Sequence, residues 1–191
     1  MLMPIFRSRP QAQLLTQLLL HPDKEFTLTE LARQIDVPLP TLQREAARLV
    51  EAGLISDRRQ GRNRLISANP DHPGTAPLTQ LVTLFFGPQA VISEEFALPN
   101  ADRVVIFGSW AARSAGQPGP PPNDIDVLVI GTASRYDVYA AADRAQRRLG
   151  QPVNPVLCTP DRWEHPGDDM LVNGIHRAPF ITAYRAEGHA A

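Results

Sequence analysis

The chain has 191 residues, of which 43% are hydrophobic, and its formal net charge is −1. This length is sufficient for two small domains that each bury a core. The charge is uneven, because residues 1–69 carry a net charge of +3 and residues 70–191 a net charge of −4. The basic N-terminal part suits a polyanionic partner, and the acidic C-terminal part suits metal binding or plain solubility.

Several classes of protein are excluded at this level. Cys158 is the single cysteine, so no internal disulfide can form, and its apolar neighbours predict a buried thiol. Residues Met1–Arg9 lack the long apolar run of a secretory signal. No apolar stretch approaches the roughly 20 residues of a membrane-spanning helix. We therefore expect a cytoplasmic protein without membrane contact.

The N-terminal part begins with two helical patterns. Leucines give Gln11–Leu20 one apolar face, which predicts a helix that ends at a following His-Pro-Asp sequence. Thr27 or Thr29 can cap a second helix, because a threonine side chain accepts a hydrogen bond from the first helical turn.

A third helix and a hairpin follow. The helix is expected to begin at Pro40 or Thr41, because proline suits the first helical turn, and to end at Ala52 before a glycine. Leu54–Asp57 and Arg64–Ala68 are predicted strands, joined by glycine and asparagine residues typical of turns. Three helices and a hairpin within seventy residues is the order of a winged helix-turn-helix.

This order predicts a DNA-binding surface. The second helix of a helix-turn-helix enters the major groove, where glutamine pairs with adenine and arginine with guanine. The outward positions of the third helix are Thr41, Gln43, Arg44 and Arg48. The predicted wing adds Arg58, Arg59, Arg62 and Arg64, with only Asp57 opposing them. The alternative is a protein-binding winged helix with a solvated basic hairpin, but a clustered basic face favours double-stranded DNA.

Three stretches, Phe26–Ala32, Thr41–Glu45 and Arg48–Ile55, resemble prokaryotic winged-helix regulators of the ArsR/MarR-like kind. The resemblance covers about residues 10–68 and implies transcriptional regulation. Metal-sensing relatives use Cys or His clusters, which this part of the chain lacks. A homodimer is expected, because helix-turn-helix proteins commonly bind two half-sites.

A connecting region separates the two predicted domains. Asn69–Pro77 is rich in turn-forming residues, and Pro77–Phe86 and Pro88–Ala97 are candidate bridging helices. The chain is thus divided into a winged helix-turn-helix at 1–69, a linker with bridging helices at 70–98 and a second domain at 99–191. An apolar face that could dock on either domain or on a second copy is formed by Leu81, Leu84 and Phe85.

The second domain alternates strands and helices, which predicts an α+β protein with a small mixed sheet in this half. Gly116–Pro122 is a loop, because its prolines are incompatible with a regular helix. The predicted strands are Arg103–Phe107, Ile125–Ile130 and Val153–Cys158. The predicted helices are Ser109–Arg113, Tyr136–Leu149, Leu171–Ile175 and Phe180–Tyr184.

Two short motifs in this domain carry chemistry. Gly108-Ser109 lies between a strand and a helix, where a glycine allows close approach of a phosphate and the helix start offers unpaired N–H groups. Asp124 and Asp126 alternate along a strand, so their carboxylates project together and favour Mg²⁺ or Mn²⁺ between them. Taken alone, the two aspartates could also be turn-forming residues at the start of a strand.

Together these motifs resemble the minimal nucleotidyltransferases of the DNA polymerase beta-like superfamily, over about Arg103–Trp163. The resemblance implies that Gly108 and Ser109 contact a bound nucleoside triphosphate and that Asp124 and Asp126 hold metal ions. Arg113 could assist the phosphates or be a surface residue.

Two features depart from the family pattern. The Gly116–Pro122 loop lengthens the spacing between the motifs, and Asn154 stands where the third carboxylate of the family is expected. An asparagine cannot act as a base and binds hard cations weakly, which puts nucleotide transfer in doubt.

The sequence therefore predicts a DNA-binding regulator whose nucleotidyltransferase-like domain binds a metal–nucleotide complex with weak or no transfer activity. The alternative is an active Mg²⁺-dependent nucleotidyltransferase that modifies a protein, RNA or a small molecule. A partner protein is also possible, because minimal nucleotidyltransferases often act in two-component modules of the toxin–antitoxin kind.

Overall fold

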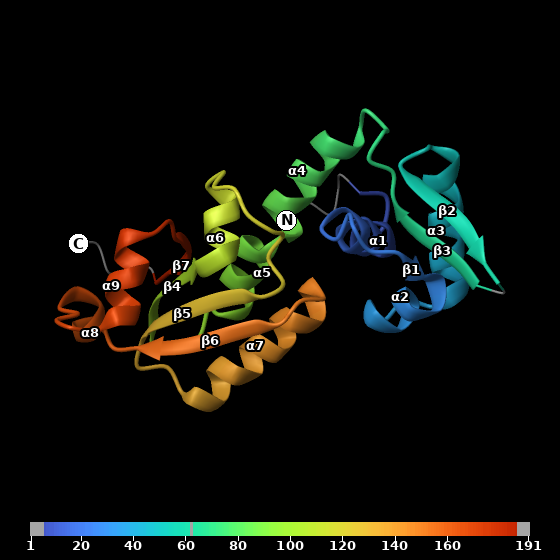
Figure 1. Cartoon of the computed structure of the whole chain (residues 1–191). Coiled ribbons are helices and arrows are strands. Elements are labelled where there is room, and N and C mark those ends of the chain that lie inside the picture. The colour runs from blue at the N-terminus through green and yellow to red at the C-terminus, as the bar shows by residue number, and fades with distance from the viewer. Residues whose placement is uncertain (1–5, 62, 187–191) are drawn as a thin grey trace. The chain divides into compact units, whose positions relative to one another are not determined.

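The computed structural model describes residues 6–61 and 63–186. The chain divides into two compact units, Met1–Gly87 and Pro88–Ala191, each with a hydrophobic core of its own (Figure 1). The boundary lies between the two candidate bridging helices, so one helix belongs to each unit. No helix in the described part of the chain combines the length and apolarity that crossing a membrane requires.

The first unit contains helices and a three-stranded antiparallel sheet with the order β1-β3-β2. Its elements are α1 (Arg9–Leu19), β1 (Phe26–Thr27), α2 (Leu28–Gln34), α3 (Leu39–Glu51), β2 (Ile55–Gln60), β3 (Asn63–Ala68) and α4 (Thr75–Phe86).

Local capping explains where the helices of this unit begin. Thr27 caps α2 in a capping box, because its hydroxyl accepts from the Glu30 backbone N–H while the Glu30 carboxylate accepts from the Thr27 N–H. Helix α3 begins at Leu39, slightly earlier than predicted, because Pro40 occupies the first turn, where no N–H is needed. The predicted three helices and hairpin are confirmed, with longer strands than expected.

Helix α4 completes the core of this unit by packing on α1. Val82 is fully buried, and Phe86 packs beside it with its ring edge-on to a core phenylalanine. The apolar face predicted from Leu81, Leu84 and Phe85 does not make this packing, since Leu84 is 65% exposed and Phe85 39% exposed, and its docking on a second copy stays a prediction. Residues four apart on the opposite stripe, Val82 and Phe86, make the contact instead.

The second unit is built around a four-stranded mixed sheet with the order β6-β5-β4-β7, in which only β5 and β6 are parallel. Its elements are α5 (Pro88–Glu95), β4 (Ala101–Phe107), α6 (Gly108–Ser114), β5 (Ile125–Gly131), α7 (Arg135–Leu149), β6 (Val153–Cys158), α8 (Pro160–Glu164), α9 (Met170–Arg177) and β7 (Ile181–Arg185). The predicted α+β class with a small mixed sheet is confirmed.

One predicted element of this unit is wrong. Phe180–Tyr184 was expected to be helical, but Ile181–Arg185 forms strand β7 along the free edge of β4. The branched residues Ile181 and Thr182 favour an extended backbone, and the pairing partner lies about eighty residues earlier in the chain.

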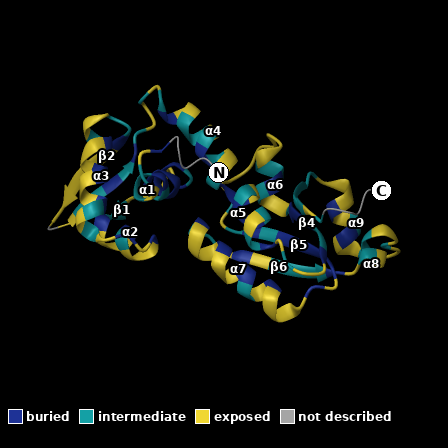
Figure 2. Cartoon of the chain, turned by 180° about the vertical axis from the view of Figure 1, so that it is seen from behind, coloured by how far each residue is buried: buried dark blue, intermediate teal, exposed yellow. Residues whose placement is uncertain are grey.

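Alternation along β5 places different chemistry on the two faces of the sheet. Val127 and Val129 face α5 and α7, whereas Leu128 and Ile130 face α8 and α9. Helix α7 carries both buried and exposed residues along its length, as the burial colours of Figure 2 show. Because side chains alternate with a period of two, Asp126 projects from the same face as Leu128, beyond the apolar cluster under α9. This end of the sheet holds the predicted acidic motif.

Candidate functional site

Helix α3 presents a polar outer face in the first unit. The side chains of Gln43, Arg44 and Arg48 are exposed, Thr41 is half-buried, and Leu42 is fully buried in the core. The Arg44 guanidinium donates to the Thr41 hydroxyl at 3.5 Å. The structure thus puts all four candidate DNA-contacting residues of this helix where they can reach a partner.

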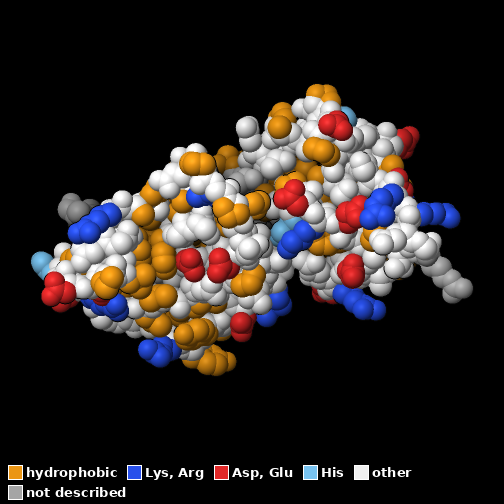
Figure 3. Space-filling view, viewed as in Figure 1, with side chains coloured by type: hydrophobic (Ala, Val, Ile, Leu, Met, Phe, Trp, Pro, Cys, Tyr) orange, Lys and Arg blue, Asp and Glu red, His pale blue; other side chains and the backbone are white. Residues whose placement is uncertain are grey.

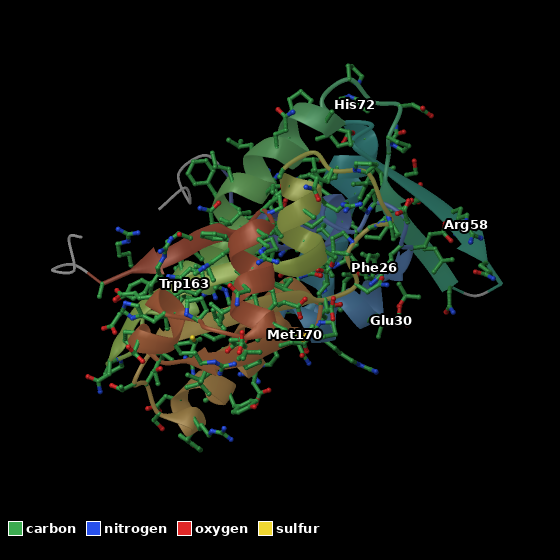
Figure 4. All side chains as sticks on the ribbon, turned by 60° about the vertical axis from the view of Figure 1, so that its left-hand side comes forward. Phe26, Glu30, Arg58, His72, Trp163 and Met170 are labelled. Carbon is green, nitrogen blue, oxygen red and sulfur yellow. The ribbon has the colours of Figure 1, made fainter. Side chains whose placement is uncertain are left out.

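The arginines of the wing have more acidic partners than the sequence indicated. Arg58 projects from the β2–β3 hairpin (Figure 4) and donates from Nε to the Glu25 carboxylate at 2.6 Å and from Nη2 to its second oxygen. Hydrogen bonding from Arg58 lowers the pKa of Glu25. Arg64 pairs with Asp57 at 2.8 Å. The expectation that only Asp57 opposes the wing arginines is wrong, because Glu25 lies far from the hairpin in sequence and is brought to it by the fold.

Other cations of this face differ in how they are held. Arg48 pairs with the buried carboxylate of Glu45 at 3.2 Å, one turn earlier on α3. Arg59 is exposed and stands opposite Arg64 in the hairpin, with no acidic partner among the residues described. Arg62, the remaining predicted wing residue, lies outside the described residues.

A polar hollow lies where α2, α3 and the wing converge. Its volume is about 420 Å³. It is lined by Thr27, Leu28, Thr29, Leu39, Gln43, Asn63 and Arg64. The hollow therefore joins the outer face of α3 to the turn end of the hairpin, which gives an extended partner a continuous polar surface.

Glycine at position 108 shapes the candidate site of the second unit. Gly108 has a φ of +71°, a conformation that side chains with a Cβ rarely adopt. A Cβ there would lie 2.5 Å from Oδ2 of Asp126, which stands opposite Phe107 in the sheet. Glycine at this position therefore leaves room for the Asp126 carboxylate, and the predicted phosphate contact of Gly108 stays a prediction.

The acidic pair and Asn154 meet at this end of the sheet. Parallel pairing of β5 with β6 places Asn154 beside Asp126. Nδ2 of Asn154 donates to Oδ2 of Asp124 at 2.9 Å and to Oδ1 of Asp126 at 3.3 Å. Figure 3 shows acidic side chains on a largely apolar and uncharged face of the second unit. One amide thus joins two carboxylates from the end of the neighbouring strand.

The electrostatics of this group follow from its partial burial. Burial raises the pKa of the Asp126 carboxyl; the hydrogen bond from Asn154 opposes this rise, and the charge of Asp124 adds to it. No group of three or more Asp, Glu, His or Cys side chains suited to a metal ion occurs among residues 6–61 and 63–186. The cluster therefore has two carboxylates and one amide.

A pocket of about 320 Å³ adjoins the acidic pair. It is lined by Ser109, Arg113, Pro120, Pro121, Pro122, Asn123 and Asp124. Ser109 and Arg113 lie four residues apart on α6, so both side chains face the pocket from one side of that helix. The Gly116–Pro122 loop forms the opposite wall and packs so tightly that a Cβ on Gly119 would overlap the Arg113 guanidinium.

Arg113 has unmet hydrogen-bonding capacity. Its Nε and Nη1 atoms are buried without a hydrogen-bond partner. Buried donors without partners destabilise a protein, and an arginine pairs best with a carboxylate or a phosphate. An anion that reaches the guanidinium would supply these partners.

The residues that would hold a divalent cation are Asp124 and Asp126. Oxygens of Asp124 and Asp126 already point at a single atom, Nδ2 of Asn154. Carboxylate oxygens are the ligands that hard divalent cations prefer. The Gly108 cradle keeps this space open, because any larger residue would intrude on Asp126.

An aromatic cluster elsewhere in the unit was not predicted from the sequence. The Arg103 guanidinium lies 5.6 Å from the ring centroids of both Trp163 and Phe180 and donates to the Thr182 hydroxyl. The Trp163 ring also contacts His176 edge-on, at 4.2 Å between centroids. These residues pack around the sheet face under α8 and α9, which supports a structural role.

Residues 7–63 match the MarR family. The match spans α1 to the start of β3 and includes the predicted recognition helix and most of the wing. The first unit contains a MarR-type winged helix-turn-helix. No match was found among the curated proteins, and neither the family match nor the solved structures described next name a nucleotidyltransferase.

Several solved structures are also similar. Reduced HlyU from Vibrio cholerae N16961 is 19% identical, with 41% of this chain and 78% of HlyU covered at a TM-score of 0.36. The transcriptional repressor BigR from Xylella fastidiosa is 24% identical, with coverages of 46% and 82% and a TM-score of 0.37. Lactococcus lactis ZitR in complex with DNA is 17% identical, with coverages of 42% and 55% and a TM-score of 0.34.

Proposed function

We propose that the protein is a DNA-binding transcriptional regulator whose second unit binds a nucleotide with a divalent cation as its regulatory ligand. The observation that carries the DNA part is the exposed face of α3, with Gln43 and Arg44, beside a wing rich in arginine. A MarR-type winged helix-turn-helix with this surface has the base-reading and phosphate-contacting side chains that DNA recognition needs.

The proposed division of roles follows from side-chain chemistry. Gln43 and Arg44 would read base edges in the major groove, where their planar groups can make paired hydrogen bonds. Arg59, which has no acidic partner among the described residues, would contact phosphate from the wing.

The proposal for the second unit rests on the pocket beside α6. Ser109 and Arg113 offer a hydroxyl and unpaired N–H groups to the phosphates of a nucleotide. Asp124 and Asp126 would hold a divalent cation, which would neutralise phosphate charge close to the carboxylates. The motif's likeness to minimal nucleotidyltransferases supports a nucleotide as the ligand.

A mobility-shift titration on the DNA upstream of the protein's own coding region tests the DNA role. The double variant Arg44→Ala/Arg59→Ala is expected to lose roughly tenfold or more in affinity, because it removes one base contact and one phosphate contact. Arg147→Ala, which removes an exposed arginine from α7, is the matched control and should bind like the wild type. Equal binding by all three proteins would refute the DNA role.

Thermal unfolding with and without Mg²⁺ and a nucleoside triphosphate tests the ligand role. We expect the wild type to be stabilised by the complex, because a ligand that binds the folded state raises its stability. Asp124→Ala/Asp126→Ala should lose this response. If no nucleoside triphosphate stabilises the wild type, the proposed nucleotide role is refuted.

An active nucleotidyltransferase is the second candidate function, favoured by the intact Gly108-Ser109 and Asp124/Asp126 motifs. Labelled nucleotide offered to protein, RNA and small-molecule acceptors tests it. Transfer that disappears in Asp124→Ala/Asp126→Ala would establish this activity, and labelling that survives in that variant would come from another source.

A further inference from the structure

We infer that Asn154 limits the acidic site to a single divalent cation and thereby makes the second unit hold its nucleotide without consuming it. This inference deepens the proposed ligand role and rests on it. Asn154 contacts both carboxylates of the site, so it acts directly on how many cations the site binds.

The geometry gives the first step. Asn154 occupies the third corner of the acidic site, within hydrogen-bond distance of Asp124 and Asp126. A carboxylate at the same position would complete a cluster of three, the arrangement in which one carboxylate can be shared between two cations. The amide leaves only two charged ligands, and they converge on one point.

Charge balance gives the second step. Two carboxylates compensate the charge of one divalent cation, whereas a second cation would have only the neutral amide oxygen of Asn154 to add to them. The amide also presents its N–H group to the carboxylates in the structure. An incoming cation therefore competes with this N–H group and can receive Oδ1 only after the amide rotates, so one cation is accommodated at a reduced affinity.

The consequence for the nucleotide is the third step. Phosphoryl transfer at a two-metal site uses the second cation, together with a nearby carboxylate, to prepare the attacking hydroxyl. Asn154 carries no negative charge and cannot accept that proton. A nucleotide in this pocket is consequently retained as a ligand, which is what a regulatory domain requires.

Mn²⁺ titration of the full chain, followed by electron paramagnetic resonance, measures the number of bound cations directly. With a non-hydrolysable nucleoside triphosphate, we expect one Mn²⁺ per wild-type chain, after subtraction of the Mn²⁺ that unbound nucleotide holds in solution. Asn154→Asp is expected to bind two and to hold Mn²⁺ alone roughly tenfold or more tightly. Because Asn154 is exposed, the aspartate fits without loss of packing, and Asn154→Glu provides a second variant.

Gln146→Glu is the matched control, because it adds the same charge at an exposed residue of α7 that does not line the pocket. It should keep one Mn²⁺. Two Mn²⁺ in the wild type, or an unchanged count and affinity in both position-154 variants, would overturn the inference. Loss of nucleotide binding in every protein would refute the proposed ligand role instead, while the titrations with Mn²⁺ alone would still decide the effect of position 154.

Discussion

The ion pair between Glu25 and Arg58 provides a sharp test of how the wing contacts DNA. Both side-chain hydrogen bonds of Arg58 go to the Glu25 carboxylate. A phosphate must compete with this carboxylate for the guanidinium. Glu25→Gln keeps the size of the side chain and removes its charge, so it should release Arg58 for DNA.

Counterion release sets the size of the expected effect. Each phosphate neutralised by a protein cation steepens the dependence of log K on log salt by about 0.9. One additional contact from Arg58 therefore predicts a slope steeper by roughly 0.9 and, from counterion release alone, an affinity about eightfold higher near 0.1 M salt. The gain should shrink as salt rises, because the same counterions are then released into a more concentrated solution.

Fluorescence anisotropy of labelled promoter DNA at several salt concentrations measures both quantities. Asp23→Asn is the matched control, since it removes the same charge from an exposed residue two positions away. It should raise affinity less and leave the slope close to that of the wild type. An unchanged slope in Glu25→Gln, or equal gains in both variants, would show that Arg58 makes no phosphate contact.

Three further outcomes are expected. Gly108→Ala should lower the stability of the second unit by roughly 1–2 kcal/mol from backbone strain alone, in addition to the overlap with Asp126, and an unchanged denaturant midpoint would contradict this. Arg113→Met should raise the thermal midpoint of the ligand-free protein, because it removes buried unpaired donors, and abolish stabilisation by Mg²⁺ and nucleotide; a variant that is less stable but still responsive would contradict this. Burial lowers the pKa of His21 below 6.5, so the unfolded state takes up the proton first as pH falls. Unfolding free energy should therefore decrease below about pH 6.5, by at most about 1.4 kcal/mol per pH unit, and His21→Gln should remove this dependence in denaturant titrations.

The parts of the fold that the sequence predicted are those governed by local rules. Helix α3 follows from apolar spacing with a proline in its first turn, and α2 from the Thr27 cap. The juxtaposition of Asp126 with Asn154 could also be anticipated, because two strands joined by a helix pair in parallel and bring equivalent positions together.

The parts that were missed depend on contacts between distant residues. Glu25 carries no local sign that it will pair with Arg58, since 33 positions separate them. Strand β7 depends on the free edge of β4, and a short apolar run such as Phe180–Tyr184 is ambiguous between helix and strand without that partner. Helix α8 did have a local signal, because Thr159 caps it and Pro160 opens it.

Three unusual features of the second unit lie around one pocket. Gly108 holds a left-handed backbone, Arg113 buries donors without partners, and Asp124 and Asp126 bring two carboxylates close to one another. The buried unpaired donors and the close carboxylates carry a free-energy cost in the ligand-free chain, whereas glycine adopts a left-handed backbone readily. A cation between the carboxylates and a phosphate beside Arg113 would offset both costs together, while the conformation of Gly108 leaves room for Asp126. We propose that one ligand combining a divalent cation with phosphates would relieve both the unpaired donors of Arg113 and the close carboxylates.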